Sequence, residues 1–207
     1  MKTKSTQQHI GNKLKLDLHT HVWEATGFSE PTPQIVERVV RQVKGSGIDG
    51  IAITDHRNRG YGFAFKRLLD EHFPNEVIVI PGWEIEVKIG PGRNDEYQVA
   101  EMFLPNGGVF RSYCHPGYPT PRIVVNGVQA IEIDNLMHNW HIDKAKVEEV
   151  ASQHDLLLVR VSDAHRLEEL GGSYTEVTLE ELCSRAQSSG SPLRGAPTKQ
   201  GGRSGSL

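Results

Sequence analysis

The chain has 207 residues, 37% of them hydrophobic, and it carries a formal net charge of −3. This length fits one domain with a sizeable core, and 21 Gly and 11 Pro indicate many tight turns. A weakly acidic chain lacks the basic face that binds long nucleic acids, so that class of partner is disfavoured.

The two cysteines, Cys114 and Cys183, are too few for a disulfide scaffold, so we expect a cytoplasmic protein. The first residues contain no apolar run of the kind found in signal peptides. No later stretch reaches the roughly 18 apolar residues of a membrane span, and we expect no membrane partner.

The first half of the chain alternates predicted strands with predicted helices. Alternating apolar side chains predict a strand over residues 13–21, and short apolar runs predict two more over 50–54 and 77–80. The last of these is expected to bend and continue through residues 84–87. One helix is predicted to open at Pro31 and Pro33 and to close at Gly45 and Gly47, and a second helix is predicted over residues 63–73.

The second half continues the alternation with more strands. Strands are predicted over residues 97–104, 109–114, 128–133 and 156–161. A helix is predicted over residues 142–153, and a short one follows Thr178, which is paired with Glu181 in a capping box. The pattern predicts an α/β fold with a largely parallel sheet.

The expected domain organisation is simple. Residues 1–12 are an N-terminal extension, residues 13–186 form one domain, and residues 187–207 form a flexible tail rich in Ser and Gly.

Histidines and acidic residues gather where the predicted strands end. His19 and His21 stand two apart on a strand, so both imidazoles face the same side. Asp163 and His165 repeat this spacing with one carboxylate. The full set of expected ligands is His19, His21, His56, Glu84, His115, Asp163 and His165. Each histidine alone is more often structural than a ligand, but their joint placement favours a metal site.

The ligand types indicate which ions the site would hold. Imidazole mixed with carboxylate suits Zn²⁺, Mn²⁺ or Fe²⁺ better than Ca²⁺. Glu84 can bridge two ions. Cys114 offers a soft ligand, but it alternates with His115 along a strand, and we expect it to pack into the core.

Five motifs, in this order, resemble those of the polymerase and histidinol phosphatase (PHP) family of metal-dependent phosphoesterases. They are Asp17-Leu18-His19-Thr20-His21, Thr54-Asp55-His56, Pro81-Gly82-Trp83-Glu84, Cys114-His115-Pro116 and Ser162-Asp163-Ala164-His165. The resemblance extends over residues 13–177, and the ordered set is more specific than any single motif. It implies an α/β fold, a distorted and compact (β/α)7-like barrel, and up to three metal ions.

The same resemblance distributes the ligands among the ions. It implies that one ion lies among the ligands His19, His21, Glu84 and Asp163. A second would be held by Glu84 and His115, and a third by His56 and His165. Glu84, His115 and Asp163 are the residues expected to take part in catalysis, in which metal-activated water attacks phosphorus.

The chain also departs from the family pattern. Many members carry an acid or imidazole shortly after the first motif, and Glu24 is the candidate here, as a possible metal ligand. Gln98 stands where many members have a histidine, and the stretch from Gln98 to His115 is short. A weaker or missing second ion is therefore one expectation.

Other polar residues have two interpretations each. Arg57, Arg59 and Arg166 follow ligand motifs and are either phosphate contacts or ordinary surface residues. His138 and His141 line either the mouth of the site or a solvated loop. Asp17 either orients an imidazole or ends its strand.

The leading hypothesis is a metal-dependent phosphoesterase, using two or three Mn, Zn or Fe ions on a small phosphomonoester or nucleotide. A nuclease-like phosphodiesterase of the same fold is the first alternative. An amidohydrolase-type barrel also begins with His-x-His, but the chain is short for it. The third alternative is a barrel that has lost catalysis and binds a partner.

Overall fold

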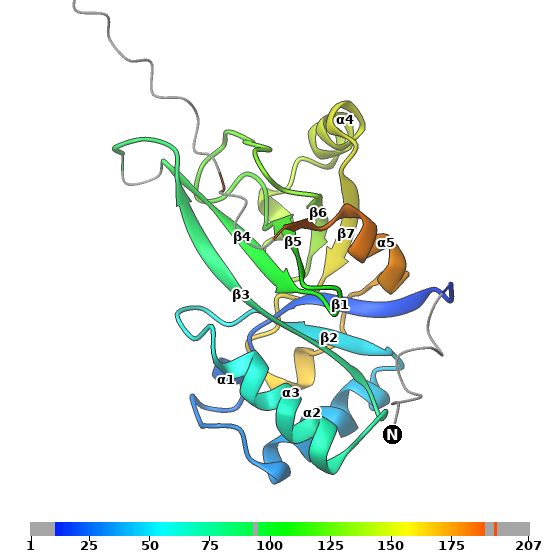
Figure 1. Ribbon diagram of the computed structural model, residues 1–207. Coiled ribbons are helices and arrows are strands. Elements are labelled where there is room, and N and C mark those ends of the chain that lie inside the picture. Colours follow the sequence, from blue (N-terminus) through cyan, green and yellow to red (C-terminus); the bar gives the residue numbers. More distant parts are fainter. Residues whose placement is uncertain (1–10, 93–94, 189–192, 194–207) are drawn as a thin grey trace, which may run out of the picture.

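The computed structural model describes residues 11–92, 95–188 and 193, which form a mixed α/β structure around one sheet (Figure 1). The strand order is β7-β6-β5-β4-β3-β2-β1-β8, and β9 pairs with β5. The strands are β1 Leu14–Thr20, β2 Gly50–Ile53, β3 Ile78–Lys88, β4 Glu96–Phe103, β5 Gly108–Tyr113, β6 Ala130–Asn135, β7 Leu157–Val161, β8 Thr175–Val177 and β9 Gln187–Ser188. The α-helices are α1 Val22–Ala25, α2 Pro33–Gly45, α3 Tyr61–His72, α4 Lys144–His154 and α5 Leu179–Arg185, with 3-10 turns η1 Asn139–His141 and η2 Leu167–Glu169.

The sheet curls until its first and last strands meet. β8 pairs antiparallel with β1, and the Thr175 hydroxyl of β8 accepts from the Arg160 amide of β7 (2.8 Å) and donates to the Arg160 carbonyl (2.9 Å). Near the carboxyl end of β1, the Asp163 amide donates to the His19 carbonyl at 2.9 Å. The result is a nearly closed barrel, which confirms the predicted fold class.

The sheet is mixed rather than largely parallel, so that part of the prediction is wrong. β1, β2 and β3 run parallel, as do β5, β6 and β7, but β4 is antiparallel to both of its neighbours. The physical reason is the length of the connections. Residues 104–107 alone join β4 to β5, whereas a parallel crossover needs about a dozen residues or more.

Helices cover two sides of the barrel. α2 and α3 lie side by side against β2 and β3, and α4 lies beside β6 and β7 (Figure 1). Val36, Val39 and Val43 form the buried stripe of α2, as its sequence period predicts. Leu14, Leu16 and Leu18 of β1 belong to a separate core cluster that also includes residues of β2, β3, β4, β5, β6, β7 and β8.

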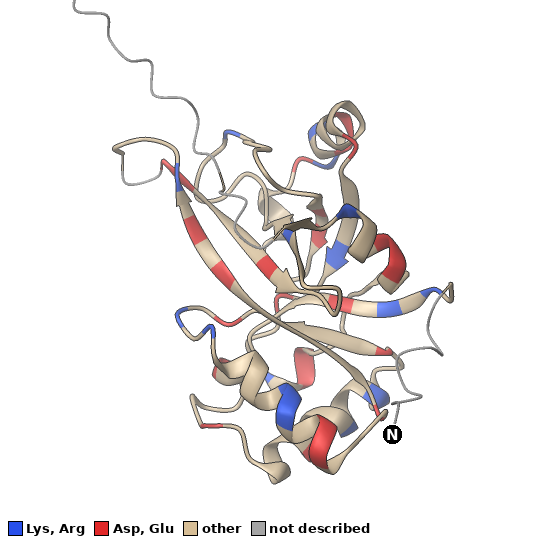
Figure 2. Cartoon of the chain, in the orientation of Figure 1, with Lys and Arg blue, Asp and Glu red and all other residues tan. Residues whose placement is uncertain are grey.

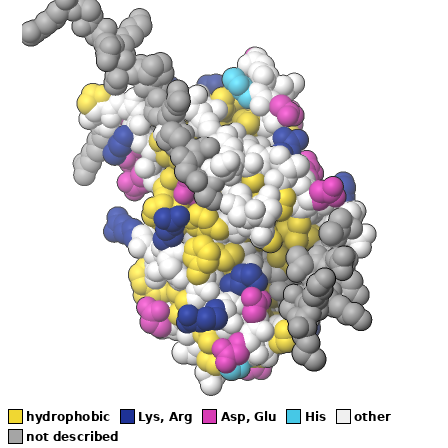
Figure 3. All heavy atoms as spheres, viewed as in Figure 1, with side chains coloured by type: hydrophobic (Ala, Val, Ile, Leu, Met, Phe, Trp, Pro, Cys, Tyr) yellow, Lys and Arg dark blue, Asp and Glu magenta, His cyan; other side chains and the backbone are white. Residues whose placement is uncertain are grey.

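The surface carries both charge types. Lys and Arg alternate with Asp and Glu along the elements in view, without a continuous basic band (Figure 2). Hydrophobic side chains appear across the middle of the same face (Figure 3). No helix of the described residues is long and apolar enough to cross a membrane. Of the predicted flexible tail, Gln187 and Ser188 form β9 and Leu193 is described, while the other residues lie outside the described part.

Candidate metal centre

The predicted ligands all lie at one end of the barrel, where the parallel strands have their carboxyl ends. β1 supplies His19 and is followed at once by His21, β3 supplies Glu84, and the segments after β2, β5 and β7 supply the rest. His56 forms an isolated backbone bridge with Glu84. Five of the ligands are buried, namely His19, His21, Glu84, His115 and Asp163, whereas His56 and His165 are half-buried.

A β-bulge in β1 determines the direction of the His19 and His21 side chains. Asp17 pairs with Ile51 and Thr20 with Ile53. Between these two pairs β1 advances by three residues and β2 by only two. A bulge of this kind reverses the alternation of side chains. His19 and His21 therefore point into the barrel above Leu14, Leu16 and Leu18, which already fill its interior.

Two ligands have an unusual backbone. His115 has φ of 28° and Asp163 has φ of 55°, both in the left-handed region that non-glycine residues seldom adopt. Such conformations cost about 1–3 kcal/mol and concentrate at functional sites. Hydrogen bonds hold both: the His115 amide donates to Glu132 Oε2 (2.7 Å), and the Asp163 amide to the His19 carbonyl (2.9 Å).

The first ligand group is His19, His21, Glu84 and Asp163. The Nε2 atoms of His19 and His21 are 3.1 Å apart. Glu84 Oε2 lies 3.5 Å from His19 Nε2 and 3.6 Å from His21 Nε2. Asp163 Oδ1 lies 3.0 Å from His21 Nε2 and 3.5 Å from His19 Nε2. Four donor atoms, from β1 and the residue after its end, from β3 and from the segment after β7, thus lie close together.

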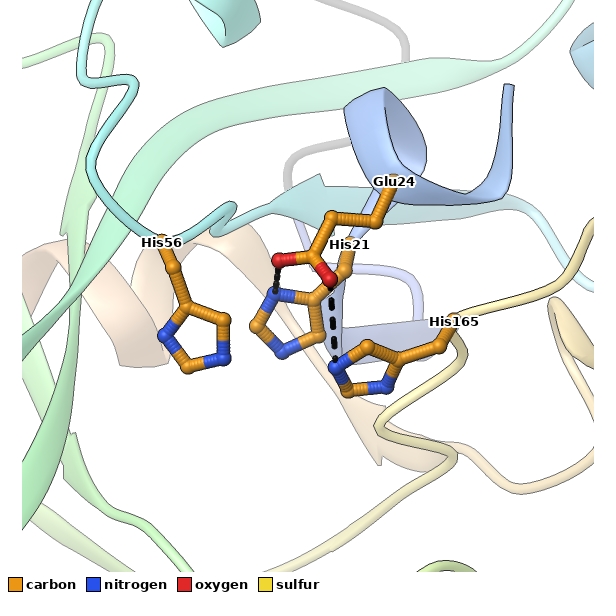
Figure 4. Close-up of side chains that lie close together, drawn as sticks. All are labelled: His21, Glu24, His56 and His165. Carbon is orange, nitrogen blue, oxygen red and sulfur yellow. Dashed lines mark ion pairs between the residues drawn. The ribbon is translucent and has the colours of Figure 1, made fainter. Parts of the chain in front are cut away.

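A second group surrounds the outer ring nitrogen of His21. Glu24, His56 and His165 face one another around His21 (Figure 4), with donor atoms all within 4.8 Å. The Glu24 carboxylate lies 4.0 Å from His21 Nδ1 and 3.9 Å from His165 Nε2. The structure therefore brings Glu24 together with His56 and His165, the pair predicted to share an ion.

A third group contains a residue that the sequence analysis left open. His115 Nε2 lies 3.4 Å from Glu84 Oε1. His115 also forms a group with His138 and Asp163 whose donor atoms are within 4.8 Å of one another. His138 therefore belongs to the mouth of the site, not to a separate solvated loop.

Glu132 and Asn135 hold the ligands in place, and the sequence analysis gave them no role. Glu132 Oε1 accepts from His19 Nδ1 at 2.8 Å, which turns Nε2 of that ring toward the centre. Asn135 donates from Nδ2 to Glu132 Oε2 (2.9 Å) and to Asp163 Oδ2 (3.1 Å). The signal available in the sequence was that Glu132 stands between two isoleucines of a predicted strand, and the structure shows that it is fully buried.

Asp17 and Asp55 act on the backbone rather than on imidazoles. Asp17 accepts from the Ser162 amide and hydroxyl (3.0 and 2.5 Å) and from the Gly171 amide (3.0 Å), which ties β1 to the segment after β7. Asp55 Oδ1 accepts from the amides of Trp23 and Glu24 at the start of α1. Burial raises the pKa of Asp17 to about 6 and that of Asp55 to about 7.

Buried polar atoms without partners test whether ions fit. His21 Nδ1, Glu84 Oε1 and His138 Nδ1 are buried and have no hydrogen-bond partner among the described residues. An unpaired buried polar atom is costly, and a bound cation would satisfy Glu84 Oε1. The donor set of imidazole and carboxylate suits divalent transition metals. These residues fit the implied ions.

The ionisation of the two carboxylates and of His21 agrees with this fit. Burial opposes the charge on Glu84, but the imidazoles of His19 and His115 hold its pKa well below the usual value. Burial also opposes the charge on Asp163, and His19 and His21 likewise lower its pKa. Burial lowers the pKa of His21, so this ring stays neutral and keeps the lone pair that metal binding requires.

The remaining predicted residues lie at the edge of the centre or outside it. Arg57 is exposed and forms no ion pair with a described residue, whereas Arg166 pairs with Glu169 at 2.6 Å. Arg59 stacks over the rings of Trp83 and Phe103. Gln98 lies opposite Glu86 in the β3–β4 pairing.

Cys114 packs into the core, as expected from its place before His115. It is fully buried, and its donor atom lies within 4.8 Å of those of His19 and Glu132. Burial raises the pKa of the Cys114 thiol well above its usual value. A protonated, enclosed thiol is a poor nucleophile.

Comparisons with known proteins found similar structures but no similar sequences. No protein-family model and no curated protein matches the sequence. PsfC from Pseudomonas syringae has a similar structure, with 15% identity, a TM-score of 0.55, and coverage of 82% of this chain and 87% of that one. A Bifidobacterium adolescentis protein, provisionally described as a metal-dependent phosphoesterase, has 13% identity, a TM-score of 0.58, and coverage of 82% and 96%.

A third similar structure is an amidohydrolase from Chromobacterium violaceum with bound sulfate and no metal. It has 14% identity, a TM-score of 0.58, and coverage of 84% of this chain and 97% of that one. At such identities the likeness concerns the fold. The distorted barrel expected from the sequence motifs is confirmed as a fold, and the similar structures include one described as a metal-dependent phosphoesterase.

Proposed function

We propose that the protein is a metal-dependent phosphoesterase that hydrolyses a small phosphomonoester or nucleotide with two or three divalent ions (Mn, Zn or Fe). One observation carries the proposal: seven predicted ligands from five separate segments converge at one end of the barrel, and both carboxylates among them face imidazoles. The order of the motifs and the phosphoesterase neighbour favour a phosphate ester as substrate.

The residues of the centre have different roles in the proposed reaction. Bound divalent ions supply a water nucleophile at neutral pH and neutralise phosphate oxygens. Glu84 and Asp163 present their oxygens to the centre, and Glu132 fixes the ring of His19. His115 donates from Nδ1 to the Tyr118 carbonyl (3.3 Å), so its Nε2 lone pair faces Glu84. Arg57, free of ion pairs with described residues, is the proposed phosphate contact at the rim.

The proposed substrate is small. The chain's net charge of −3 gives no long-range attraction for a polyanion, and Lys and Arg do not form a continuous band in Figure 2. A nuclease-like activity on diesters and a non-catalytic barrel remain the alternatives. The free Cys114 and Cys183 support a reducing compartment, the cytoplasm.

A second candidate function is amide hydrolysis, favoured by the amidohydrolase among the similar structures. Both reactions use the same donor set. Choice of substrate separates them.

The test is turnover of one chromogenic phosphomonoester and one phosphodiester by chelator-stripped protein, with and without Mn²⁺. We expect turnover only with Mn²⁺ and mainly of the monoester. His19→Ala and Asp163→Ala should abolish it, because each removes a buried donor of the first group, while circular dichroism shows an intact fold. Turnover at the wild-type rate in both variants would contradict the proposal. So would the absence of turnover of either ester by metal-loaded wild-type protein.

A further inference from the structure

His138 lies on the segment between β6 and η1, and two contacts hold it at the centre. Its amide donates to Asn135 Oδ1 at 3.0 Å, while Asn135 Nδ2 donates to Asp163 Oδ2 at 3.1 Å. One side chain thus fixes both the start of the segment and the orientation of the carboxylate.

The ring of His138 packs among three other rings, those of His115, Tyr118 and His141. It lies 4.5 Å from the His115 ring and is stacked 5.3 Å from the Tyr118 ring, with an interplanar angle of 17°. No hydrogen bond within the described residues uses either of its ring nitrogens, and Nδ1 is buried. A surface histidine would leave both nitrogens to water, whereas this one turns Nε2 to within 3.9 Å of Asp163 Oδ2.

The two carboxylates of the centre each face two ligand groups. Glu84 Oε2 faces His19 and His21, while Oε1 faces His115. Asp163 Oδ1 faces His19 and His21, while Oδ2 faces His138. Carboxylates that divide their oxygens in this way are suited to bridge two ions about 3.5–4 Å apart.

We infer that His138 is a metal ligand, and that with His115 it completes the second ion of a pair bridged by both Glu84 and Asp163. This assignment rests on the metal centre of the proposed function but is independent of the ester. Ligand nitrogens lie about 2.0–2.1 Å from Zn²⁺, so two donors of one ion are at most about 4.2 Å apart. The 3.9 Å separation of His138 and Asp163 meets that limit.

The experiment counts ions rather than turnover. Stripped full-length protein is titrated with Mn²⁺, bound metal is measured by mass spectrometry after desalting, and the pair is observed as a spin-coupled signal by electron paramagnetic resonance. His138→Ala should lose one Mn²⁺ per chain, or bind it at least about tenfold more weakly, and lose the coupled signal. His138→Asp, which restores a donor atom, should recover the ion.

His141→Ala is the matched control, since this ring stacks on Tyr118 from the same segment and belongs to none of the donor groups. It should keep the wild-type count. Equal counts and affinities in wild type and His138→Ala would overturn the assignment, and so would equal losses in both alanine variants. A wild-type protein that binds a coupled pair but cleaves no ester would keep the assignment and contradict the proposed function.

Discussion

The centre depends on single residues that serve two ligands at once. Glu132 is the clearest case, because one oxygen accepts from His19 Nδ1 and the other from the His115 amide and Asn135. A carboxylate behind a ligating imidazole sets the tautomer and raises the basicity of the facing nitrogen. Glu132 therefore links the first and third ligand groups without touching an ion itself.

Replacing this carboxylate tests that role. Glu132→Gln keeps the shape of the side chain but supplies one acceptor oxygen instead of two, so His19 or the His115 amide loses its partner. We expect Mn²⁺ affinity to fall about 10- to 100-fold, measured by calorimetric titration. Glu86→Gln removes an exposed carboxylate two residues from Glu84 on the same strand and should leave affinity unchanged. Unchanged affinity in both variants would contradict the role of Glu132.

At this scale the sequence predicted which candidate ligands lie together, and their binding of ions stays a prediction. His-x-His and Asp-x-His spacing shows which side chains share a face of a strand, and these pairs do meet in the structure. For His138 the sequence left two positions open, and it gave Glu132 and Asn135 no role, because their roles follow from contacts between segments far apart in the chain. Their partners His19 and Asp163 stand 113 and 28 residues away from Glu132 and Asn135, respectively.

The elements place the site through irregularities in their pairing. β1 has a bulge between Asp17 and Thr20, and β6 has another between Glu132 and Asp134. The second bulge lets Glu132 and Asn135, three residues apart, act on the same side. Alternation alone predicts the strands but not where their phase shifts, since a bulge depends on the neighbouring strand. The antiparallel course of β4 follows instead from the short connection of residues 104–107, which the prediction of a largely parallel sheet did not take into account.

Two segments at the mouth depend on a glycine. Gly117 has φ of +107°, and a Cβ there would stand 2.3 Å from the His141 carbonyl oxygen, so the segment after β5 lies directly on the one that carries His138. Gly117→Ala must separate them. Gly47 also has a positive φ, +71°, but a Cβ there would meet nothing within 4 Å.

The pair of glycines separates backbone strain from close packing. Gly47→Ala should cost about 1–2 kcal/mol of unfolding free energy for its left-handed backbone. Gly117→Ala should add about 1–3 kcal/mol for the clash, and it should also weaken the Mn²⁺ ion assigned to His138. Urea unfolding and the Mn²⁺ count measure the two effects. Equal destabilisation by both substitutions, with an unchanged ion count, would show that the contact with His141 does not hold the segment.

On the scale of the whole molecule, the centre joins β1 and β3 to the segment after β7. The first ligand group takes side chains from β1, β3 and the segment after β7, so it spans the barrel near the place where the ring closes through β8. Without an ion, that end gathers Glu84, Asp163 and Glu132 in a buried space. An ion would offset this charge and hold the strands together, which couples metal binding to the stability of the fold.

Removing metal should therefore lower the melting temperature. An ion bound only by the folded chain adds about 2.7 kcal/mol when its concentration is 100 times its dissociation constant. For a chain of this length each kcal/mol shifts the melting temperature by about 2–4 °C, so Mn²⁺ should raise it by about 5–10 °C over chelator-stripped protein. Differential scanning calorimetry measures the shift, and His19→Ala is the control, because it lacks a donor of the first group and should respond much less. Identical melting temperatures for stripped and Mn²⁺-loaded wild type would mean that the folded barrel does not bind the ion preferentially.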